Sequence, residues 1–260
     1  MSIGRTLILA KGWYEEFKIN RWPKPYSFHN LDHIKADCQA ADKLIAAAFL
    51  GNDPLRIRED LFKWNQKHSD NQIKETELAA VCEMALIFHD LGNILETVIN
   101  KDNTLVPVFL DKYLAKGAED RSGKIAKILM ENSLSDKTKE RYLRLVLHLI
   151  EQTSFIVSEK CPFGLFTRMV DQIGSGLFAE NKTRNRGLLE ETLAENPQTE
   201  IVPDSFYNFT RLRLTELVPD HAIRQAILDI WDKKLPVIID VPKKPIRIDK
   251  WLAKTAIIKG

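Results

Sequence analysis

The sequence lacks the features that mark secreted and membrane-spanning proteins. Its three cysteines, Cys38, Cys82 and Cys161, lie far apart, and none forms a CxxC pair. Such cysteines indicate neither a disulfide framework nor a thiolate zinc site, so we expect buried thiols in a reducing compartment. No apolar run reaches the roughly 18 residues of a membrane span, and the apolar stretch 7–10 is too short for a signal peptide. We therefore expect a cytoplasmic protein without a membrane partner.

The charges of the chain are nearly balanced. Its 260 residues include 38 lysines and arginines and 36 aspartates and glutamates, a formal net charge of +2. This balance gives no general reason to expect nucleic acid as a partner. Hydrophobic residues make up 44% of the chain and charged residues 28%, as in ordinary globular proteins, and the length is ample for a real core.

Most of the chain shows the apolar spacing of amphipathic helices. Residues three and four positions apart form apolar stripes, so we expect helices over about 27–50, 54–68, 71–91, 118–132, 136–154, 165–177, 205–217 and 220–233. A shorter helical stretch is predicted around 105–115, and a loop with a short helix over 181–204. β-Prone runs and prolines after residue 235 predict a short strand pair or an extended arm.

This pattern predicts an all-α fold with a short irregular or β-like C-terminal tail. No convincing domain boundary precedes about residue 200. We therefore expect a single domain over residues 1–260, with its core at about 20–180 and a C-terminal appendage at about 200–260.

The most informative feature is the pair His89-Asp90, which directly follows the apolar run 84–88 and precedes Leu91-Gly92. An adjacent imidazole and carboxylate can both reach one divalent cation. A buried carboxylate without a partner is costly, and a metal ion is a good partner. The doublet therefore predicts a metal site, and the remaining ligands must come from elsewhere in the chain.

Two further segments could complete such a site. His29 and His33 lie four positions apart, so on a helix both imidazoles would share one face. Asp171 is another carboxylate among apolar neighbours. Two imidazoles and two carboxylates suit a divalent ion of Mn, Fe, Zn, Mg, Ni or Co, and they leave positions open for water.

The order of these residues on a helical chain resembles the HD-domain superfamily of metal-dependent phosphohydrolases. Segment 26–34, YSFHNLDHI, resembles the His-Asn-x-x-His element of cyclic-nucleotide phosphodiesterases and the "YHxLxHI" element of a group of predicted HD hydrolases. Segment 87–92 resembles the doublet that names the superfamily, and Val170-Asp171 resembles its last ligand. The resemblance covers about residues 20–180.

The resemblance implies an HD-domain helical bundle whose metal ligands are His33, His89, Asp90 and Asp171. It further implies that His29 protonates the leaving group. The choice between His29 and His33 as first ligand stays open at this point. We favour His33, since in these families the doublet's partner is usually the histidine that starts the long helical run.

A metal-dependent phosphohydrolase acting on a nucleotide or another small phosphate ester is the function that this resemblance implies. Asp171 or Asp90 could accept a proton from the attacking water as well as bind the metal. Arg21, Lys24 and Arg168 are candidates for binding the substrate phosphate, the alternative for each being a solvated surface charge. The oligomeric state stays open.

The sequence also departs from the family pattern. Asn93 stands where many nucleotide hydrolases carry a lysine or histidine, and Thr153 lacks the histidine that often follows it. His148 could replace that histidine, although its apolar neighbours favour a core role. These departures favour the alternative of a non-catalytic HD-type module, whose structural metal supports binding of a nucleotide or a protein. A metal-dependent oxygenase ranks last, because His148 alone could supply the extra ligands it needs.

Overall fold

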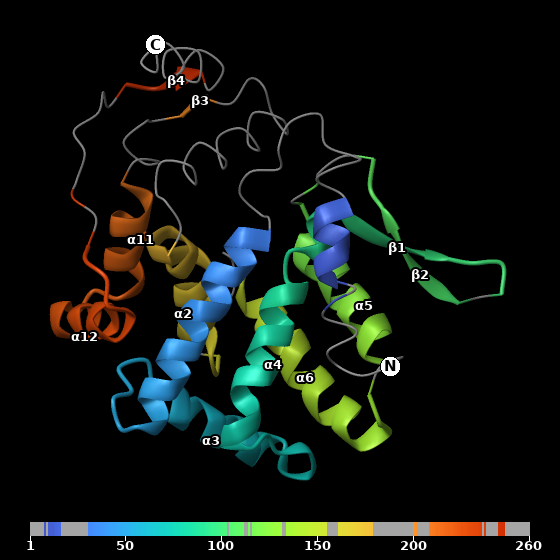
Figure 1. Ribbon diagram of the computed structural model, residues 1–260, viewed down its shortest axis with the longest axis horizontal. Coiled ribbons are helices and arrows are strands. Elements are labelled where there is room, and N and C mark those ends of the chain that lie inside the picture. Colours follow the sequence, from blue (N-terminus) through green and yellow to red (C-terminus); the bar gives the residue numbers. More distant parts are fainter. Residues whose placement is uncertain are drawn as a thin grey trace.

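The computed structural model describes residues 8, 10–16, 31–102, 104–111, 114, 116–131, 134–154, 161–178, 200–201, 208–235, 237 and 244–247. These residues are mostly helical, with two small antiparallel strand pairs (Figure 1). Within them, no helix combines the length and the apolar character that crossing a membrane requires.

The main helices follow the predicted segments closely. They are α2 (Leu31–Phe49), α3 (Ile57–Lys67), α4 (Glu75–Phe88), α5 (Ala118–Glu131), α6 (Asp136–Gln152), α7 (Gly164–Arg168), α8 (Ser175–Phe178), α11 (Phe209–Leu217) and α12 (His221–Trp231). Short 3-10 turns follow α3 and α4, at η1 (Ser69–Asn71) and η2 (Leu91–Asn93). The predicted start of the first helix, before residue 31, lies outside the described residues.

Carboxylate caps determine where several helices begin. The Asp53 side chain accepts hydrogen bonds from the backbone N–H of Ile57 (2.8 Å) and of Arg58 (2.9 Å), so α3 begins after Pro54 rather than at it. Asp220 accepts from the N–H of Ile223 (3.0 Å) at the start of α12. Such caps satisfy N–H groups that have no partner within the helix, and each is worth about 1 kcal/mol.

Helix α2 lies in the middle of the helical body and packs against α4, α8 and α12 (Figure 1). Apart from His33 and Asp37 its buried face is apolar, and each fully buried Leu or Ile contributes about 1.5–3 kcal/mol. Two hydrogen bonds tie α12 to it: the Trp231 Nε1–H donates to the Ala40 carbonyl (3.0 Å), and Lys43 donates to the Trp231 carbonyl (3.2 Å). This packing makes α2 a rigid platform for any side chain it carries.

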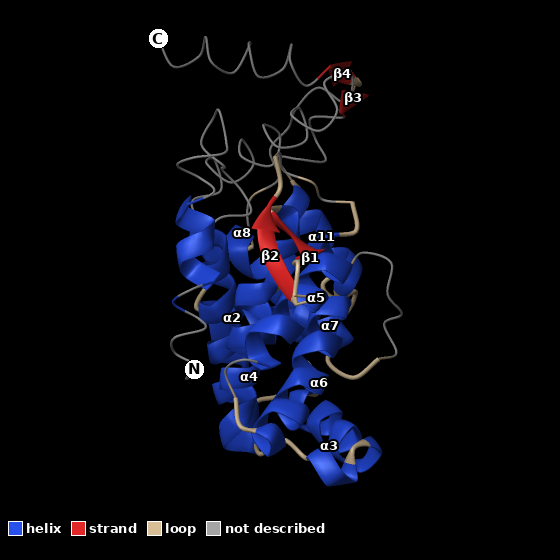
Figure 2. Ribbon diagram, turned by 90° about the vertical axis from the view of Figure 1, so that its right-hand side faces the viewer, coloured by secondary structure: helices blue, strands red, loops and turns tan. Residues whose placement is uncertain are grey.

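The helix predicted around residues 105–115 is wrong. Residues Leu95–Ile99 (β1) and Leu105–Phe109 (β2) form an antiparallel hairpin beside α5, with Val98 opposite Val106 (Figure 2). The apolar run that suggested a helix is rich in valine and contains Pro107, which disfavours a helix interior. Short apolar runs fit either periodicity, and here the turn-forming residues before the run decide for a strand.

The predicted helix over 165–177 is interrupted. Residues Met169–Gly174 (η3) form a π-helix between α7 and α8. In the tail, Ile246–Arg247 (β4) pairs with Glu200–Ile201 (β3), so a short strand pair is present, with one strand outside the tail. The loop predicted over 181–204 lies outside the described residues apart from β3.

Candidate metal centre

Side chains from three separate segments meet at one buried point. His33 and Asp37 lie one turn apart on α2, His89 and Asp90 follow the last turn of α4, and Asp171 lies in the π-helix. Contacts of α2 with both α4 and η3 bring the three segments together. The structure thus assembles every described residue that the sequence predicted as a metal ligand.

The distances among these groups are short. Nε2 of His33 lies 3.4 Å from Oδ2 of Asp90 and 3.5 Å from Oδ1 of Asp171. Nε2 of His89 lies 3.3 Å from the same two oxygens. Atoms bound to one cation at about 2.0–2.2 Å would be separated by comparable distances. The geometry therefore fits a shared cation.

Asp37 belongs to this cluster and was missed in the sequence. Its Oδ2 lies 3.2 Å from Nε2 of His33, and its side chain is fully buried. Donor atoms of His33, Asp37, His89 and Asp171 all lie within 4.8 Å of one another. The available signal was the i,i+4 spacing between His33 and Asp37 on the apolar face of a predicted helix.

A backbone hydrogen bond fixes the orientation of His89. Its Nδ1 lies 2.7 Å from the Leu86 carbonyl oxygen, which can only accept, so Nδ1 carries the proton. In the neutral imidazole, Nε2 then presents a lone pair toward the carboxylates of Asp90 and Asp171. A lone pair facing carboxylate oxygens is favourable only when a proton or a metal ion lies between them.

Asn93 holds the Asp90 carboxylate in place. Its Nδ2 donates to Oδ1 of Asp90 (2.9 Å), and the residue is buried. Oδ2 of Asp90 is the oxygen that faces the two imidazoles. Asn93, which differs from the residues usual at this position in the resembled family, therefore has a local role: its amide orients the predicted ligand Asp90.

Helix α5 fixes the turn that follows the doublet. The Ser122 hydroxyl donates to the His89 carbonyl and accepts from the Gly92 N–H, and Arg121 donates to the Gly92 carbonyl. A Cβ at Gly92 would lie 2.0 Å from the Ala118 carbonyl oxygen, so this close approach requires glycine. The doublet is thus anchored independently of its contacts in the cluster.

The π-helix brings Asp171 against α2. A Cβ at Gly174 would lie 2.7 Å from the Ala40 Cβ and 3.7 Å from Oδ1 of Asp37, so the two segments approach closely here. Single π-helical turns within α-helices occur frequently at functional sites. The irregular segment is therefore consistent with a role for Asp171 in a site rather than in packing alone.

The electrostatics of the cluster favour positive charge. Burial alone would lower the pKa of His33, but the surrounding carboxylates, Asp37 foremost, raise it well above its usual value. Burial likewise opposes charge on His89, yet Asp90 and then Asp171 raise its pKa to about 9. Burial would raise the pKa of Asp171, but the two imidazoles lower it well below its usual range.

The net charge of the cluster is the same with two bound protons as with one divalent cation. Three carboxylates and two neutral imidazoles give −3 for the cluster, and protonation of both imidazoles brings it to −1. One divalent cation bound to neutral imidazoles gives the same −1. Because isolated buried charge is costly, a divalent cation can take the place of the two protons. The donor set and its charge therefore fit a divalent metal.

One side of the cluster is more open than the other. The Asp37 side chain is fully buried and that of His33 is 3% exposed, whereas Asp90 is 9% and Asp171 is 15% exposed. Water or a substrate would reach the cluster from the side of these two carboxylates. Asp171, the most exposed member, is therefore the best placed to contact an incoming molecule.

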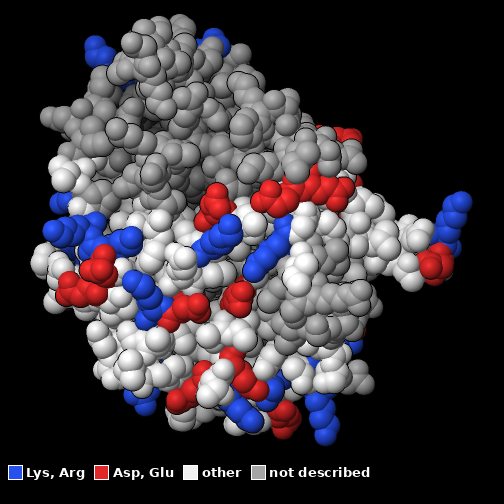
Figure 3. Space-filling model, in the orientation of Figure 1, with Lys and Arg blue, Asp and Glu red and all other residues white. Residues whose placement is uncertain are grey.

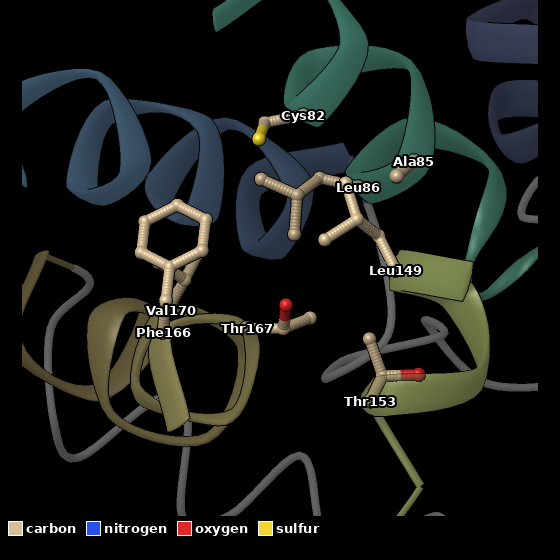
Figure 4. A pocket seen from close by; sticks show the side chains of 8 residues that line it. All are labelled: Cys82, Ala85, Leu86, Leu149, Thr153, Phe166, Thr167 and Val170. Atoms are coloured by element: carbon tan, nitrogen blue, oxygen red, sulfur yellow. The ribbon is translucent and has the colours of Figure 1, made fainter. Parts of the chain in front are cut away.

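A small cavity is lined by side chains of α4, α6, α7 and the segments next to them. It holds about 10 Å³, and its lining includes Leu86, Thr153, Thr167 and Val170 (Figure 4). Both threonine hydroxyls donate to backbone carbonyls of their own helices, so the wall is nearly apolar. Space for about one water molecule between core side chains marks a packing gap and not a substrate site.

The remaining predicted site residues have different outcomes. His29, Arg21 and Lys24 lie outside the described residues. Arg168 is buried, so the alternative of a solvated surface charge is wrong for it. His148 is not a member of the cluster among the described residues: its Nε2 lies 2.9 Å from the Pro162 carbonyl oxygen.

Comparisons of the chain with protein-family models, with curated proteins and with solved structures find no match. The buried His and Asp cluster, which could hold a metal ion, is therefore the main guide to function.

Proposed function

We propose that this protein is a metal-dependent phosphohydrolase of HD type that acts on a nucleotide or another small phosphate ester. The supporting observation is the convergence of two imidazoles and three carboxylates from α2, α4 and the π-helix. Apart from Asp37, the order of these residues along the chain is the one that the sequence motifs suggested. The proposal thus rests on both chain order and spatial convergence.

A divalent cation bound here would lower the pKa of a coordinated water and polarise a phosphoryl oxygen. His33, His89, Asp90 and Asp171 would hold it, with Asp37 beside His33. The hydrogen bond from His89 Nδ1 to a carbonyl keeps Nε2 available as a ligand atom. The Asn93 amide keeps Oδ2 of Asp90 turned toward the same point.

Proton transfers in this proposal use the open side of the cluster. Asp171 is the most exposed carboxylate, so it is suited to accept a proton from the attacking water. His29, which precedes α2 in sequence, is our candidate for protonating the leaving oxygen. Arg21, Lys24 and Arg168 remain the candidates for binding phosphate.

A substrate panel tests the proposal. The purified protein, loaded with Mn, Ni or Co, is incubated with nucleotides and small phosphate esters, and released phosphate and nucleoside are measured. We expect turnover that His89→Ala and Asp90→Ala reduce to background. Asp120→Asn, which removes an exposed carboxylate of α5 paired to Lys124, is the matched control and should retain full activity. Turnover unaffected by the two cluster variants would contradict the proposal.

A second candidate is a non-catalytic HD-type module with a structural metal. The burial of Asp37, His33 and His89 favours it, because a metal held mostly by buried groups contributes to folding. Tight metal binding with no turnover across the panel would support it. Metal present at about 100 times its dissociation constant adds about 2.7 kcal/mol, so chelation should lower the melting temperature by about 5–10 °C.

A further inference from the structure

The β1–β2 hairpin leaves apolar side chains exposed away from the metal cluster. Ile99 is 72%, Leu105 49% and Val98 38% exposed. The hairpin projects from the helical body and is largely uncharged, with blue and red groups at its tip (Figure 3). An isolated hairpin is marginally stable by itself, and its unpaired edges can pair with another strand.

The hydrogen bonds of the hairpin determine which backbone groups point outward. The N–H of Leu110 donates to the Ile94 carbonyl, and that of Asn100 to the Thr104 carbonyl. In an antiparallel pair, bonded and non-bonded residues alternate. The N–H and C=O groups of Thr97 therefore point away from β2.

The two free edges of the hairpin differ. On β2 the outward residue opposite Thr97 is Pro107, which has no N–H, so this edge is interrupted at its centre. On β1 the outward groups of Thr97 and Ile99 are intact. Within the described part of the chain, neither residue's N–H or C=O makes a hydrogen bond. Only the β1 edge is suited to accept a further strand.

We propose that the β1 edge pairs with β1 of a second copy of this chain, with the two-fold axis at Val98. In this register Thr97 of each copy lies opposite Ile99 of the other, which forms about four backbone hydrogen bonds. The result is a four-stranded sheet with the order β2–β1–β1–β2.

Three observations favour self-pairing around Val98. Because Leu95 is buried, a second strand reaches the backbone of Thr97 and Ile99 more readily, which places the centre between them. Val98 lies opposite Val106 within the hairpin, so pairing at Val98 aligns four valines in one row across the new sheet. Glu96 falls opposite Asn100 of the other copy, so no like charges face each other.

The proposed β1–β1 interface is small, so we expect it to be weak. Pairing of two five-residue strands buries less than the roughly 1,200 Å² of a stable standard interface. We therefore expect a dimer that dissociates on dilution. Sedimentation velocity of the full chain over a wide concentration range should show a reversible monomer–dimer equilibrium.

Charge exchange at the proposed axis is the decisive test. Val98→Lys or Val98→Glu alone places two like charges directly opposite each other, and each should weaken dimerisation about tenfold or more. Mixing the two variants should restore a heterodimer, because the opposite charges then meet. Leu105→Lys is the matched control: it adds a charge to the same hairpin on the other edge and should leave the dimer unchanged.

A backbone variant tests the hydrogen bonds separately. Thr97→Pro removes an outward N–H and no hydrogen bond within the hairpin, so it should abolish the dimer while the circular dichroism spectrum is retained. A chain that stays monomeric at every concentration overturns the proposal. So does a dimer that tolerates Thr97→Pro, or one whose two Val98 charge variants fail to recombine.

Discussion

Two regions of the molecule contain histidines that are buried or half-buried, and their surroundings shift the histidine pKa in opposite directions. At the His and Asp cluster, carboxylates raise the pKa of His33 and of His89 despite burial. Between α3 and α6, His148 lies against the Trp64 ring, with 4.9 Å between ring centroids. There burial lowers the pKa of His148, although the Pro162 carbonyl partly opposes the shift.

The comparison shows that burial alone does not make a histidine a ligand. Burial favours the neutral form of half-buried His148, and its Nε2 lies at hydrogen-bond distance from a backbone carbonyl, which is the environment of a structural residue. His89 also has a carbonyl partner on Nδ1, but its Nε2 faces two carboxylates. The atoms around the second ring nitrogen therefore distinguish a structural histidine from a candidate ligand.

The largest expected difference between the regions is in metal binding. His89→Ala should abolish it, because the ligand atom is lost and the carboxylates of Asp90 and Asp171 lose a partner. His148→Ala should leave the metal stoichiometry unchanged while lowering thermal stability. Elemental analysis of both purified variants measures this contrast. Equal metal content in the two variants would remove the distinction between the two regions.

A smaller effect is expected from the amide that orients Asp90. Asn93→Asp keeps the size of the side chain but replaces the donor with a carboxylate facing Asp90. Changes in groups that hold metal ligands typically cost about 10–100-fold in metal affinity or activity. Isothermal titration with Mn should show this loss. Asn65→Asp, at an amide that binds the Ile73 backbone elsewhere, is the control and should leave the affinity unchanged.

Rising pH should change the stability of the metal-free protein and the affinity for metal in opposite directions. In the metal-free protein the raised pKa of His89, about 9, stabilises the fold below its unfolded value near ~6.5. That stabilisation is lost as the pH rises from about 6.5 through about 9, so the melting temperature should fall over this range. Bound metal competes with the same protons, so its affinity should rise with pH over that range, by up to about tenfold per unit for each proton displaced. Melting curves recorded in chelator test the first statement, and metal titrations at several pH values test the second.

The smallest expected effect on metal affinity comes from Trp64, the aromatic residue that lies against His148. Trp64→Phe removes part of a ring that stacks on His68 as well as on His148. The loss of packing should cost about 1–3 kcal/mol in the free energy of unfolding, measured with urea. Metal affinity should remain within about twofold of the wild type. A loss as large as that of Asn93→Asp would mean that the two regions are coupled.

Much of the helical structure could be predicted from periodicity, since long amphipathic segments such as α2 and α6 leave little alternative. The hairpin was missed, because the short run 105–109 fits either periodicity and only Pro107 and the turn-forming residues before the run favour a strand. For the candidate site, the sequence supplied His33, His89, Asp90 and Asp171. Their order along the chain suggested them through its resemblance to a known family, and that resemblance was also the ground for favouring His33 over His29.

Asp37 and the role of Asn93 required the fold. Asp37 carries no motif of its own, and only its packing beneath His33 shows that it belongs to the cluster. Asn93 differs from the residue that the resemblance would lead one to expect, and this difference alone does not reveal which group Asn93 contacts. The hydrogen bond to Asp90 depends on the turn geometry that Ser122 and Gly92 impose. Contacts of this kind follow from tertiary packing, which periodicity does not describe.

The π-helix at Met169–Gly174 has a consequence for how this site tolerates changes in chain length. A π-turn closes i to i+5 instead of i to i+4, so it holds one more residue than the α-helix around it. We expect that deleting a residue just before Asp171 would restore a regular helix and rotate Asp171 away from the imidazoles, with the flanking apolar residues still in the core. Such a one-residue deletion should remove metal binding while the protein still folds.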